Sequence, residues 1–186
     1  EKTPFVMEGL VPYWMMRDTA VLNRVELAVG TSTILTGPNG GGKTSMLRSI
    51  AAAALLHQCG MCVPCVRACI PRFDHIFVRS GSANASMERQ SSFATEMVDL
   101  RTIMEAPGRV LALVDEPCRG TSTAEGTRLL GAILEHMPKN ITALFSTHYH
   151  ELADVAGTHR IQLGAEVIGD DCVLNYSLQE GTCRDS

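Results

Sequence analysis

The sequence predicts an α/β fold in which helices flank a mostly parallel sheet. Continuous apolar runs at residues 110–114 and 141–145 are typical of parallel strands that are buried on both faces. A stretch with helical character separates these runs, and an alternation of strands and helices favours a parallel sheet. With 186 residues, 45% of them hydrophobic and 19% charged, the chain has the length and composition of one globular domain.

The first half of the chain is expected to begin with loops and short strands and then to alternate between strand and helix. Prolines and Gly30 interrupt residues 1–31, which we interpret as an entry region. The elements expected after it are a strand at 32–36, a helix at 43–57, a β-compatible stretch at 62–70 that Pro64 interrupts, and a strand at 75–79.

The second half is expected to begin with a mobile polar loop at residues 80–92. Helical spacing of apolar residues predicts the next helix, and the two apolar runs predict buried strands. The expected elements are a helix at 93–105, a strand at 110–114, a helix at 123–137, a strand at 141–145, a short helix at 149–155, and two edge strands within 158–178 that are joined through residues 164–171.

A glycine-rich stretch between the first strand and the first helix has the pattern G-x-x-x-x-G-K-T of a phosphate-binding loop. Its residues are Gly37, Pro38, Asn39, Gly40, Gly41, Gly42, Lys43 and Thr44, followed by Ser45. Glycines let backbone N–H groups converge on an anion, Lys43 supplies a positive charge, and the Thr44 hydroxyl is placed for Mg²⁺. The alternative is a chance match in a glycine-rich turn, which the flanking strand and helix disfavour. The pattern predicts a P-loop NTPase.

Two carboxylates follow the apolar run at 110–114. Asp115 and Glu116 are therefore expected at the carboxyl end of a strand, where open α/β sheets bind ligands. In a P-loop enzyme the first acid holds Mg²⁺ together with the loop hydroxyl, and the second is placed to take a proton from the attacking water. The alternative is an acidic strand end that only caps the next turn.

A histidine follows the second apolar run. Ser146 and Thr147 lead to His148, which the neighbouring strand would direct to the same crevice as Asp115. There its imidazole could hydrogen-bond the terminal phosphate or the attacking water, whereas the alternative is a purely structural histidine. Small polar residues at 119–123 follow the acidic pair, and Thr123 is a candidate N-cap for the next helix.

Four of the seven cysteines have the spacing of the thiolates in bacterial iron–sulfur ferredoxins. Cys59 is expected at the end of a helix and Cys65 and Cys69 on a strand, so the four thiols need not converge on one metal. The lack of a second cysteine group also disfavours an iron–sulfur site. The alternative is four separate thiols, and an odd cysteine count without a secretory signal favours reduced thiols in an intracellular or organellar compartment. The four residues are Cys59, Cys62, Cys65 and Cys69.

Charge and apolar content disfavour two further classes. A net charge of -4 speaks against electrostatic nucleic-acid binding by the chain as a whole. No apolar run has the length of a membrane span, and the longest candidate, at 50–56, lies within the first predicted helix. Because the chain begins with Glu1 and stops at residues 181–186 without a finishing element, we expect a fragment of a longer protein.

Four blocks, in this order, resemble the ATPase domain of the MutS family of DNA mismatch-repair proteins. The blocks are residues 36–45, the S-S-F-A-T-E-M stretch at 91–97, Asp115-Glu116 with R-G-T-S-T at 119–123, and S-T-H-Y at 146–149. The similarity covers residues 10–163. Gly40, the Pro12-Tyr13-Trp14 stretch and the ending at 181–186 look most like the organellar homologue of plants and algae.

The resemblance implies an ABC-like ATPase layout for residues 1–186 and a role for each matching residue. Residues 37–45 would wrap the phosphates of ATP, and Thr44 and Asp115 would hold Mg²⁺. Glu116 would activate water, and His148 would sense the γ-phosphate. Pro117 stands where the family usually has an apolar residue, and it biases Glu116 toward extended backbone geometry.

The resemblance also implies partners. Ser91, in the predicted mobile loop, would reach the nucleotide of the other subunit in a homodimer or in a dimer with another MutS homologue. Tyr13 or Trp14, in the entry region, would stack on adenine. The mismatch-binding part and most of the C-terminal dimerisation region are missing, so other parts of the parent protein would bind mismatched DNA. No membrane partner is expected, and the organellar likeness points to mitochondrion or chloroplast, otherwise to nucleus or cytoplasm.

The expected function is ATP hydrolysis that switches a DNA clamp. One alternative is an ABC-type ATPase of transport or chromosome structure, which predicts an L-S-G-G-type signature that the sequence lacks. A second is a metal-binding module at residues 59–69. A third is a domain that binds nucleotide without hydrolysing it, which the presence of Asp115, Glu116 and His148 disfavours.

Overall fold

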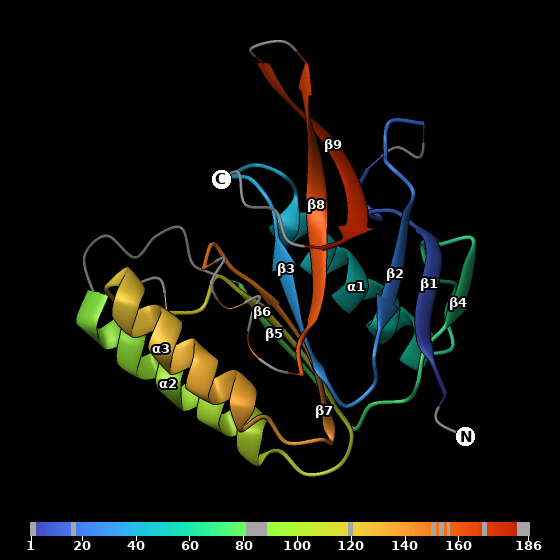
Figure 1. The fold of residues 1–186 in the computed structure, drawn as a ribbon. Coiled ribbons are helices and arrows are strands. Elements are labelled where there is room, and N and C mark those ends of the chain that lie inside the picture. The colour runs from blue at the N-terminus through green and yellow to red at the C-terminus, as the bar shows by residue number, and fades with distance from the viewer. Residues whose placement is uncertain are drawn as a thin grey trace.

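The computed structural model has a six-stranded sheet at its centre (Figure 1). It describes residues 3–15, 18–80, 89–118, 121–149, 152, 155, 157–168 and 171–181. Its helices and strands are β1 (Phe5–Leu10), β2 (Asn23–Leu27), β3 (Ser32–Thr36), α1 (Lys43–Gln58), β4 (Arg67–Cys69), β5 (His75–Arg79), α2 (Arg89–Glu105), β6 (Val110–Asp115), α3 (Thr123–Glu135), β7 (Ile141–Ser146), β8 (His159–Ile168) and β9 (Asp171–Glu180).

Parallel pairing brings the carboxyl ends of three strands to one edge of this sheet. The strand order is β5-β6-β7-β3-β8-β9, and every neighbouring pair from β5 to β8 is parallel, whereas β9 runs antiparallel to β8. As a result Thr36, Asp115 and Ser146 all lie at the same edge, and Asp115 pairs directly with Ser146. The three central strands therefore deliver the ends that carry the predicted site residues.

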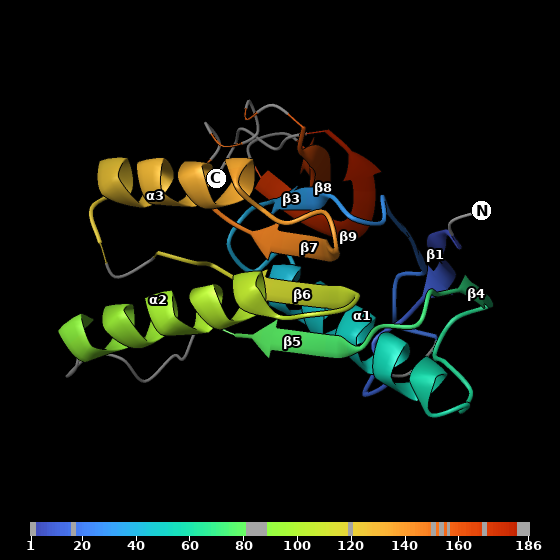
Figure 2. The ribbon, with the colours of Figure 1, turned by 90° about the horizontal axis from the view of Figure 1, so that it is seen from below.

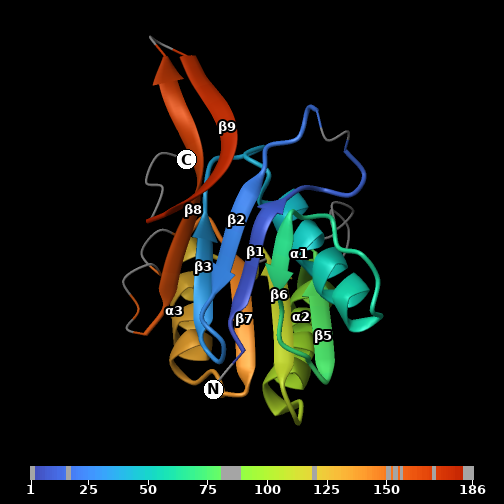
Figure 3. The ribbon, with the colours of Figure 1, turned by 90° about the vertical axis from the view of Figure 1, so that its right-hand side faces the viewer.

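The two faces of the six-stranded sheet are covered by different elements. Successive side chains of a strand point to opposite faces. Leu111 and Leu113 of β6 pack with α1 and with the three-stranded sheet β2-β1-β4, which Figure 3 shows in front of the larger sheet. Ala112 and Val114 pack on the other face with α2 and α3, which lie side by side in Figures 1 and 2. Burial on both faces explains why β6 reads as a continuous apolar run.

The predicted fold class is wrong and is corrected to an α/β fold with a mixed sheet. We expected a P-loop NTPase with a mostly parallel sheet flanked by helices, in an ABC-like ATPase layout. Instead, the antiparallel β9 completes the six-stranded sheet, and a separate antiparallel sheet shares one face with α1. Only residues 169–170 separate β8 from β9, and a parallel crossover needs a dozen or more residues, so this pair has to be antiparallel.

Several predicted elements are confirmed. Strands β3, β5, β6 and β7 match the expected segments to within one residue at each end, and helices α1 and α3 match to within two residues. The long polar stretch before the second helix is shorter than expected, because α2 already begins at Arg89. Ser91 therefore lies in a helix and not in a loop. The first turn of α2 is polar throughout, so apolar spacing gave no sign of it.

Three other expectations change in detail. The β-compatible stretch at 62–70 contains only the short strand β4, since Pro64 lacks the N–H that a central strand position requires. Strands β8 and β9 are confirmed, but the pairing continues past residue 164, where a connection was expected to begin. The register is irregular between Leu163 and Ala165. The short helix at 149–155 lies largely outside the described residues. None of the helices among the described residues is long and apolar enough to cross a membrane.

Candidate functional site

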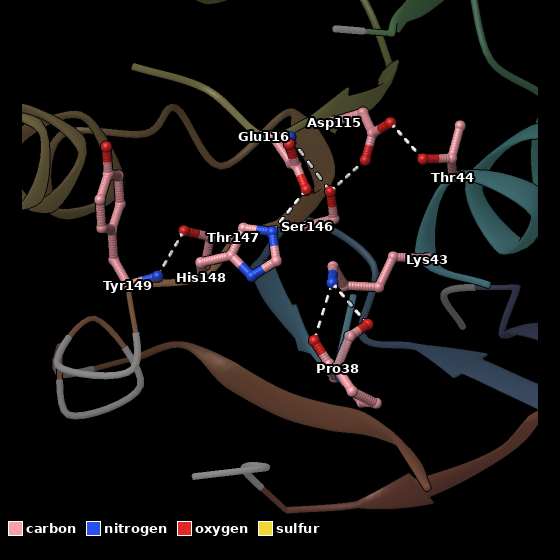
Figure 4. A network of polar contacts seen from close by, with 10 residues as sticks. Pro38, Lys43, Thr44, Asp115, Glu116, Ser146, Thr147, His148 and Tyr149 are labelled. Carbon is pink, nitrogen blue, oxygen red and sulfur yellow. Dashed lines mark hydrogen bonds and ion pairs between the residues drawn. The ribbon is translucent and has the colours of Figure 1, made fainter. Parts of the chain in front are cut away.

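The glycine-rich loop wraps around the ammonium group of Lys43. The Nζ atom donates hydrogen bonds to the carbonyl oxygens of Gly37 at 2.7 Å and Pro38 at 3.1 Å (Figure 4). The loop is closed by a hydrogen bond from the Gly41 N–H to the Pro38 carbonyl at 3.0 Å. Lys43 is buried and is the first residue of α1, so its charge lies at the start of this helix. This places a cation and a helix N-terminus next to each other, which is the combination that binds phosphate.

Gly42 allows α1 to start directly from the loop. Its φ of 92° is left-handed, a conformation that glycine adopts without strain. A Cβ atom added at Gly42 would lie 3.4 Å from Cδ1 of Tyr176, and one added at Gly41 would lie 3.0 Å from the carbonyl oxygen of Pro38. A side chain at Gly41 would therefore crowd the Pro38 carbonyl, whereas one at Gly42 would reach the Tyr176 ring.

The two predicted magnesium ligands are in direct contact. Oγ1 of Thr44, at the start of α1, donates a hydrogen bond of 2.7 Å to Oδ2 of Asp115, at the end of β6. The other carboxylate oxygen of Asp115, Oδ1, accepts a hydrogen bond from the hydroxyl of Ser146 on β7. A hydroxyl and a carboxylate are hard oxygen ligands of the type that Mg²⁺ prefers. The structure thus brings together two residues that are 71 positions apart in the sequence.

Glu116 and His148 form the next contact along the same edge. Nε2 of His148 lies 2.6 Å from Oε1 of Glu116, and both side chains are largely buried. The backbone N–H of Glu116 lies 3.1 Å from two oxygens of Ser146, the carbonyl O and Oγ. Figure 4 shows the Glu116 and His148 side chains facing each other beside Ser146. The predicted base and the predicted phosphate sensor are therefore neighbours.

The backbone at Glu116 corrects a further expectation. A residue before proline is biased to extended geometry, yet Glu116 has a φ of 47°, in the left-handed region. Cys118, on the other side of Pro117, has a φ of 63°. Left-handed backbone at residues with a Cβ is strained and persists only where surrounding contacts fix it, a situation that is common at functional sites. The turn at residues 116–118 is therefore held from outside.

A cavity of about 320 Å³ adjoins the loop, and one of its lining residues, Tyr176, was not predicted from the sequence. Gly40, Gly42 and Ser45 line one side of it, and the ring of Tyr176 from β9 lines another. The buried amide of Asn23 on β2 fixes this part of β9, because Nδ2 donates to the Tyr176 carbonyl at 3.1 Å and Oδ1 accepts from the Leu178 N–H at 2.7 Å. No local pattern links Tyr176 to the loop, since the two are distant in sequence.

The aromatic pair of the entry region lies elsewhere. The rings of Tyr13 and Trp14 contact each other edge to face, with centroids 4.9 Å apart. They line a separate open hollow with Arg48 and Val78, whereas their neighbours Pro12 and Met15 line the cavity beside the loop. The structure therefore does not bring Tyr13 or Trp14 together with the glycine loop.

The structure describes only part of the predicted residues around Ser91 and in the stretch 119–123. The side chain of Ser91 lies outside the described residues, as do Arg119 and Gly120. The N-cap of α3 is Ser122, one residue earlier than predicted, and its Oγ accepts a hydrogen bond from the Glu125 N–H. Hydrogen bonds from Ser122 and Thr121 to the carboxylate lower the pKa of Glu125.

The four clustered cysteines differ in exposure. Cys59, Cys62 and Cys69 are exposed, and Cys65 is partly buried. Within the described parts of the chain, no group of three or more His, Cys, Asp or Glu side chains is arranged to hold a metal ion. The hypothesis of a metal-binding module at residues 59–69 is therefore without structural support.

The fold and the site together define an α/β protein with a candidate phosphate site at the carboxyl edge of its sheet. A family model described as "MutS domain V" matches residues 33–186, so the chain belongs to the MutS family. The match also completes the correction of the fold class: the fold is that of MutS domain V, α/β with a mixed sheet.

Similar proteins carry the same family name. The chain is 40% identical over 188 residues to the DNA mismatch repair protein MSH1, mitochondrial, of Arabidopsis thaliana, and the match covers 97% of this chain. It is 39% identical to the DNA mismatch repair protein MutS of Listeria monocytogenes, over 80% of this chain, and 40% identical to that of Bacillus cytotoxicus, over 82%. The matches span 17% of the Arabidopsis protein and 18% of each bacterial protein. The predicted likeness to the organellar branch is thus confirmed.

Proposed function

We propose that this chain binds ATP with Mg²⁺ and hydrolyses it as part of a mismatch-repair protein. The observation that carries the proposal is the contact of 2.7 Å between Thr44 and Asp115, beside the buried ammonium of Lys43. It places a hydroxyl, a carboxylate and a cation at one helix N-terminus, as transfer of a phosphoryl group requires. Proteins of the MutS family are ATPases in general, which supports the same assignment.

The residues at the edge of the sheet fit Mg-ATP. A Cβ at Gly41 would crowd the Pro38 carbonyl, so the loop requires glycine there, and its backbone N–H groups would bind phosphate oxygens at the helix N-terminus. Thr44 and Asp115 would hold the metal ion, which supplies charge neutralisation when bound. The neighbouring cavity, with Tyr176 as one wall, has room and an aromatic surface for the base.

The acidic pair would divide the chemistry between two residues. Asp115 is oriented by Thr44 and Ser146, so its carboxylate faces the phosphate loop. Glu116 would accept the proton of the attacking water as general base. His148 holds Oε1 of Glu116 and so orients the carboxylate. Ser146 contacts both acidic residues. Its hydroxyl donates to the Asp115 carboxylate, and its hydroxyl and carbonyl oxygens accept from the backbone N–H of Glu116.

The parent protein would use this site as a switch. The relatives named above are DNA mismatch repair proteins, and we propose the same process for the protein that contains this chain. ATP bound between two subunits would draw them together, hydrolysis would release them, and domains outside this chain would bind mismatched DNA. Similarity to a relative named as mitochondrial supports an organellar location, and we propose the mitochondrion.

The test compares two variants of the full-length protein. Lys43→Ala removes the loop cation, so ATP binding measured by calorimetry is expected to fall at least about 100-fold. Glu116→Gln keeps the shape of the site but removes the base, so turnover should fall roughly 10²- to 10⁴-fold while ATP still binds. The exposed Glu105→Gln serves as the control that leaves both values unchanged.

Two outcomes would overturn the proposal. Equal ATP affinity in the wild-type protein and the Lys43→Ala variant would show that the loop does not bind the nucleotide. Equal turnover in the Glu116→Gln variant would remove Glu116 as the base. Addition of a mismatched duplex to the same assay tests the coupling, because turnover or nucleotide exchange should then change relative to a matched duplex.

A further inference from the structure

The turn that carries Glu116 is gripped from both sides at Cys118. On one side, the Cys118 N–H donates a hydrogen bond of 2.9 Å to Oε1 of Glu96, on α2. On the other side, the Cys118 carbonyl accepts a hydrogen bond of 3.0 Å from the hydroxyl of Tyr149, which follows β7. Both polar atoms of one residue are thus fixed by side chains from two distant parts of the chain.

Each of the two gripping side chains is itself held in place. The carboxylate of Glu96 is buried, and its Oε1 also accepts from Nη1 of Arg79 at 3.0 Å, while Nε of Arg79 donates to Asp99 at 3.1 Å. Arg79 is the last residue of β5, so the ion pair connects α2 to the same edge of the sheet as the site. Glu96 therefore cannot move without disturbing a buried, charge-assisted contact.

Tyr149 reaches Cys118 because α3 makes room for it. A Cβ atom at Gly126 would lie only 2.5 Å from the Tyr149 hydroxyl oxygen, so a larger residue in α3 would displace the ring. The backbone N–H of Tyr149 donates to Oγ1 of Thr147 at 3.0 Å, one residue before His148. Burial, together with the nearby carboxylates of Glu96 and Glu116, raises the pKa of Tyr149, which keeps its hydroxyl a hydrogen-bond donor.

We infer that Glu96 and Tyr149 are positioning residues for the reaction proposed above, because they hold the strained turn at 116–118 and thereby aim the Glu116 carboxylate. The inference rests on the proposed function. Neither side chain is placed to touch nucleotide; each acts through the backbone of Cys118, two residues from Glu116. Left-handed backbone on both sides of Pro117 would relax if these contacts were lost, and Glu116 would turn away from His148.

The same contacts link α2 to the turn. Glu96 is part of α2, so a displacement of this helix pulls on the Cys118 N–H and on the turn. Ser91, the residue predicted to contact the nucleotide of a partner subunit, belongs to the same helix.

Cys118 provides a reporter that does not depend on catalysis. Its side chain is fully buried, and burial, followed by the Glu96 charge, raises the pKa of its thiol to about 11. Both features make the thiol unreactive while the turn is closed. Cys59 and Cys62 are exposed and serve as internal standards for alkylation in every sample.

The experiment measures alkylation of Cys118 by iodoacetamide, by mass spectrometry, together with kcat and KM for ATP in the full-length protein. Tyr149→Phe removes one hydroxyl and no charge beside the thiol, so it is the primary variant, and Glu96→Gln is the second. For Tyr149→Phe we expect Cys118 to react about fivefold faster, which corresponds to the loss of one hydrogen bond. In both variants kcat should fall about tenfold with KM nearly unchanged, because a displaced base affects chemistry more than binding.

The control is Glu105→Gln, which removes an exposed carboxylate from the same helix and should change neither value. Cys118 reactivity and kcat that match the wild-type protein in Tyr149→Phe would overturn the inference. Faster alkylation with unchanged kcat would also overturn it, since the turn would then be held without aiming the base. If the wild-type protein shows no ATP turnover, the proposed function fails. Unchanged alkylation of Cys118 in Tyr149→Phe would show in addition that the Tyr149 hydroxyl does not hold the turn.

Discussion

Two segments at the carboxyl edge of the sheet pass through left-handed backbone, and they do so with different residues. In the glycine-rich loop at residues 37–44, Gly40 and Gly42 have φ values of 75° and 92°. In the turn after β6, Glu116 and Cys118 have values of 47° and 63°. Glycine adopts such angles freely, whereas each residue with a Cβ loses about 1–2 kcal/mol there. The loop shape is therefore encoded by its own residues, and the turn shape is imposed by its neighbours.

The contacts of the two segments show the same contrast. The loop is closed mainly from within, by Lys43 on the carbonyls of Gly37 and Pro38 and by the Gly41 N–H. The turn has one local hydrogen bond, from the Thr121 N–H to the Cys118 carbonyl at 3.4 Å, and it is otherwise fixed by side chains distant in sequence, those of Glu96, Ser146 and Tyr149. A locally encoded segment provides a constant binding surface, while a segment fixed from outside can be changed by movements elsewhere. This division would suit the switch proposed above, in which ATP would always be bound in the same way while its hydrolysis would depend on the turn.

The largest effect is expected from a side chain in the loop. Gly42→Ala forces left-handed backbone on alanine and places its Cβ near the Tyr176 ring, so the free energy of unfolding should fall by about 1–2 kcal/mol. ATP affinity, measured by calorimetry, should fall at least about tenfold because the cradle narrows.

Gly60→Ala is the matched control for this variant. Gly60 has a φ of 71°, an added Cβ there would meet nothing within 4 Å, and the residue lies at the other end of α1. It should lose a similar free energy of unfolding and keep the wild-type ATP affinity. If Gly42→Ala binds ATP normally, the loop does not depend on its glycines and the contrast between loop and turn fails.

An intermediate effect is expected in the turn, with an unusual order of variants. Cys118→Ala removes the buried sulfur but keeps the strained backbone, so it should lower the free energy of unfolding by about 1 kcal/mol. Cys118→Gly leaves a larger gap but removes the left-handed strain of about 1–2 kcal/mol, so it should be more stable than the alanine variant. Urea denaturation of both variants measures the difference. An alanine variant more stable than the glycine variant would show that the turn is not strained.

The smallest effect is a dependence of stability on pH. Cys118 ionises near 9.0 when unfolded, and burial, followed by the Glu96 charge, raises its pKa to about 11 in the fold. Because the unfolded chain releases this proton first, the contribution of the protonated Cys118 thiol to the free energy of unfolding is complete below pH 9. This contribution is lost as pH rises through about 11. The free energy of unfolding should therefore decline over this window.

Cys118→Ala isolates this contribution from other groups that titrate at high pH. In that variant the decline between pH 9 and about pH 11 should be shallower than in the wild-type protein, as measured by urea midpoints along a pH series. Parallel declines would mean that the Cys118 thiol is not kept protonated by its surroundings.

Local patterns predicted the parts of the molecule in which a residue is constrained mainly by its neighbours in sequence. The apolar runs gave strands β6 and β7, because strands buried on both faces leave no polar positions. The glycine pattern gave the loop and the start of α1 at Lys43. The closeness of Thr44 to Asp115 was also predictable, since parallel strands end at a common edge.

The parts that could not be predicted depend on contacts between distant segments. The antiparallel β9, and with it the wall of Tyr176 beside the loop, is set by pairing with β8 and by the amide of Asn23. The general preference of residues before proline for extended backbone predicted the wrong conformation for Glu116. Hydrogen bonds from the Glu116 N–H to Ser146 and from the Cys118 N–H to Glu96 outweigh this local preference.

By itself the sequence determined that this protein has a glycine-rich loop with the pattern G-x-x-x-x-G-K-T, two buried strands that lead to an acidic pair and to a histidine, and a place in the MutS family. Only the tertiary structure decided that the sheet is mixed, that Tyr176 faces the loop, and that Glu96 and Tyr149 hold the turn of Glu116. The physical reason is that glycine freedom and apolar runs act over a few residues, whereas strain at a residue with a Cβ is maintained only by side chains that folding brings from elsewhere.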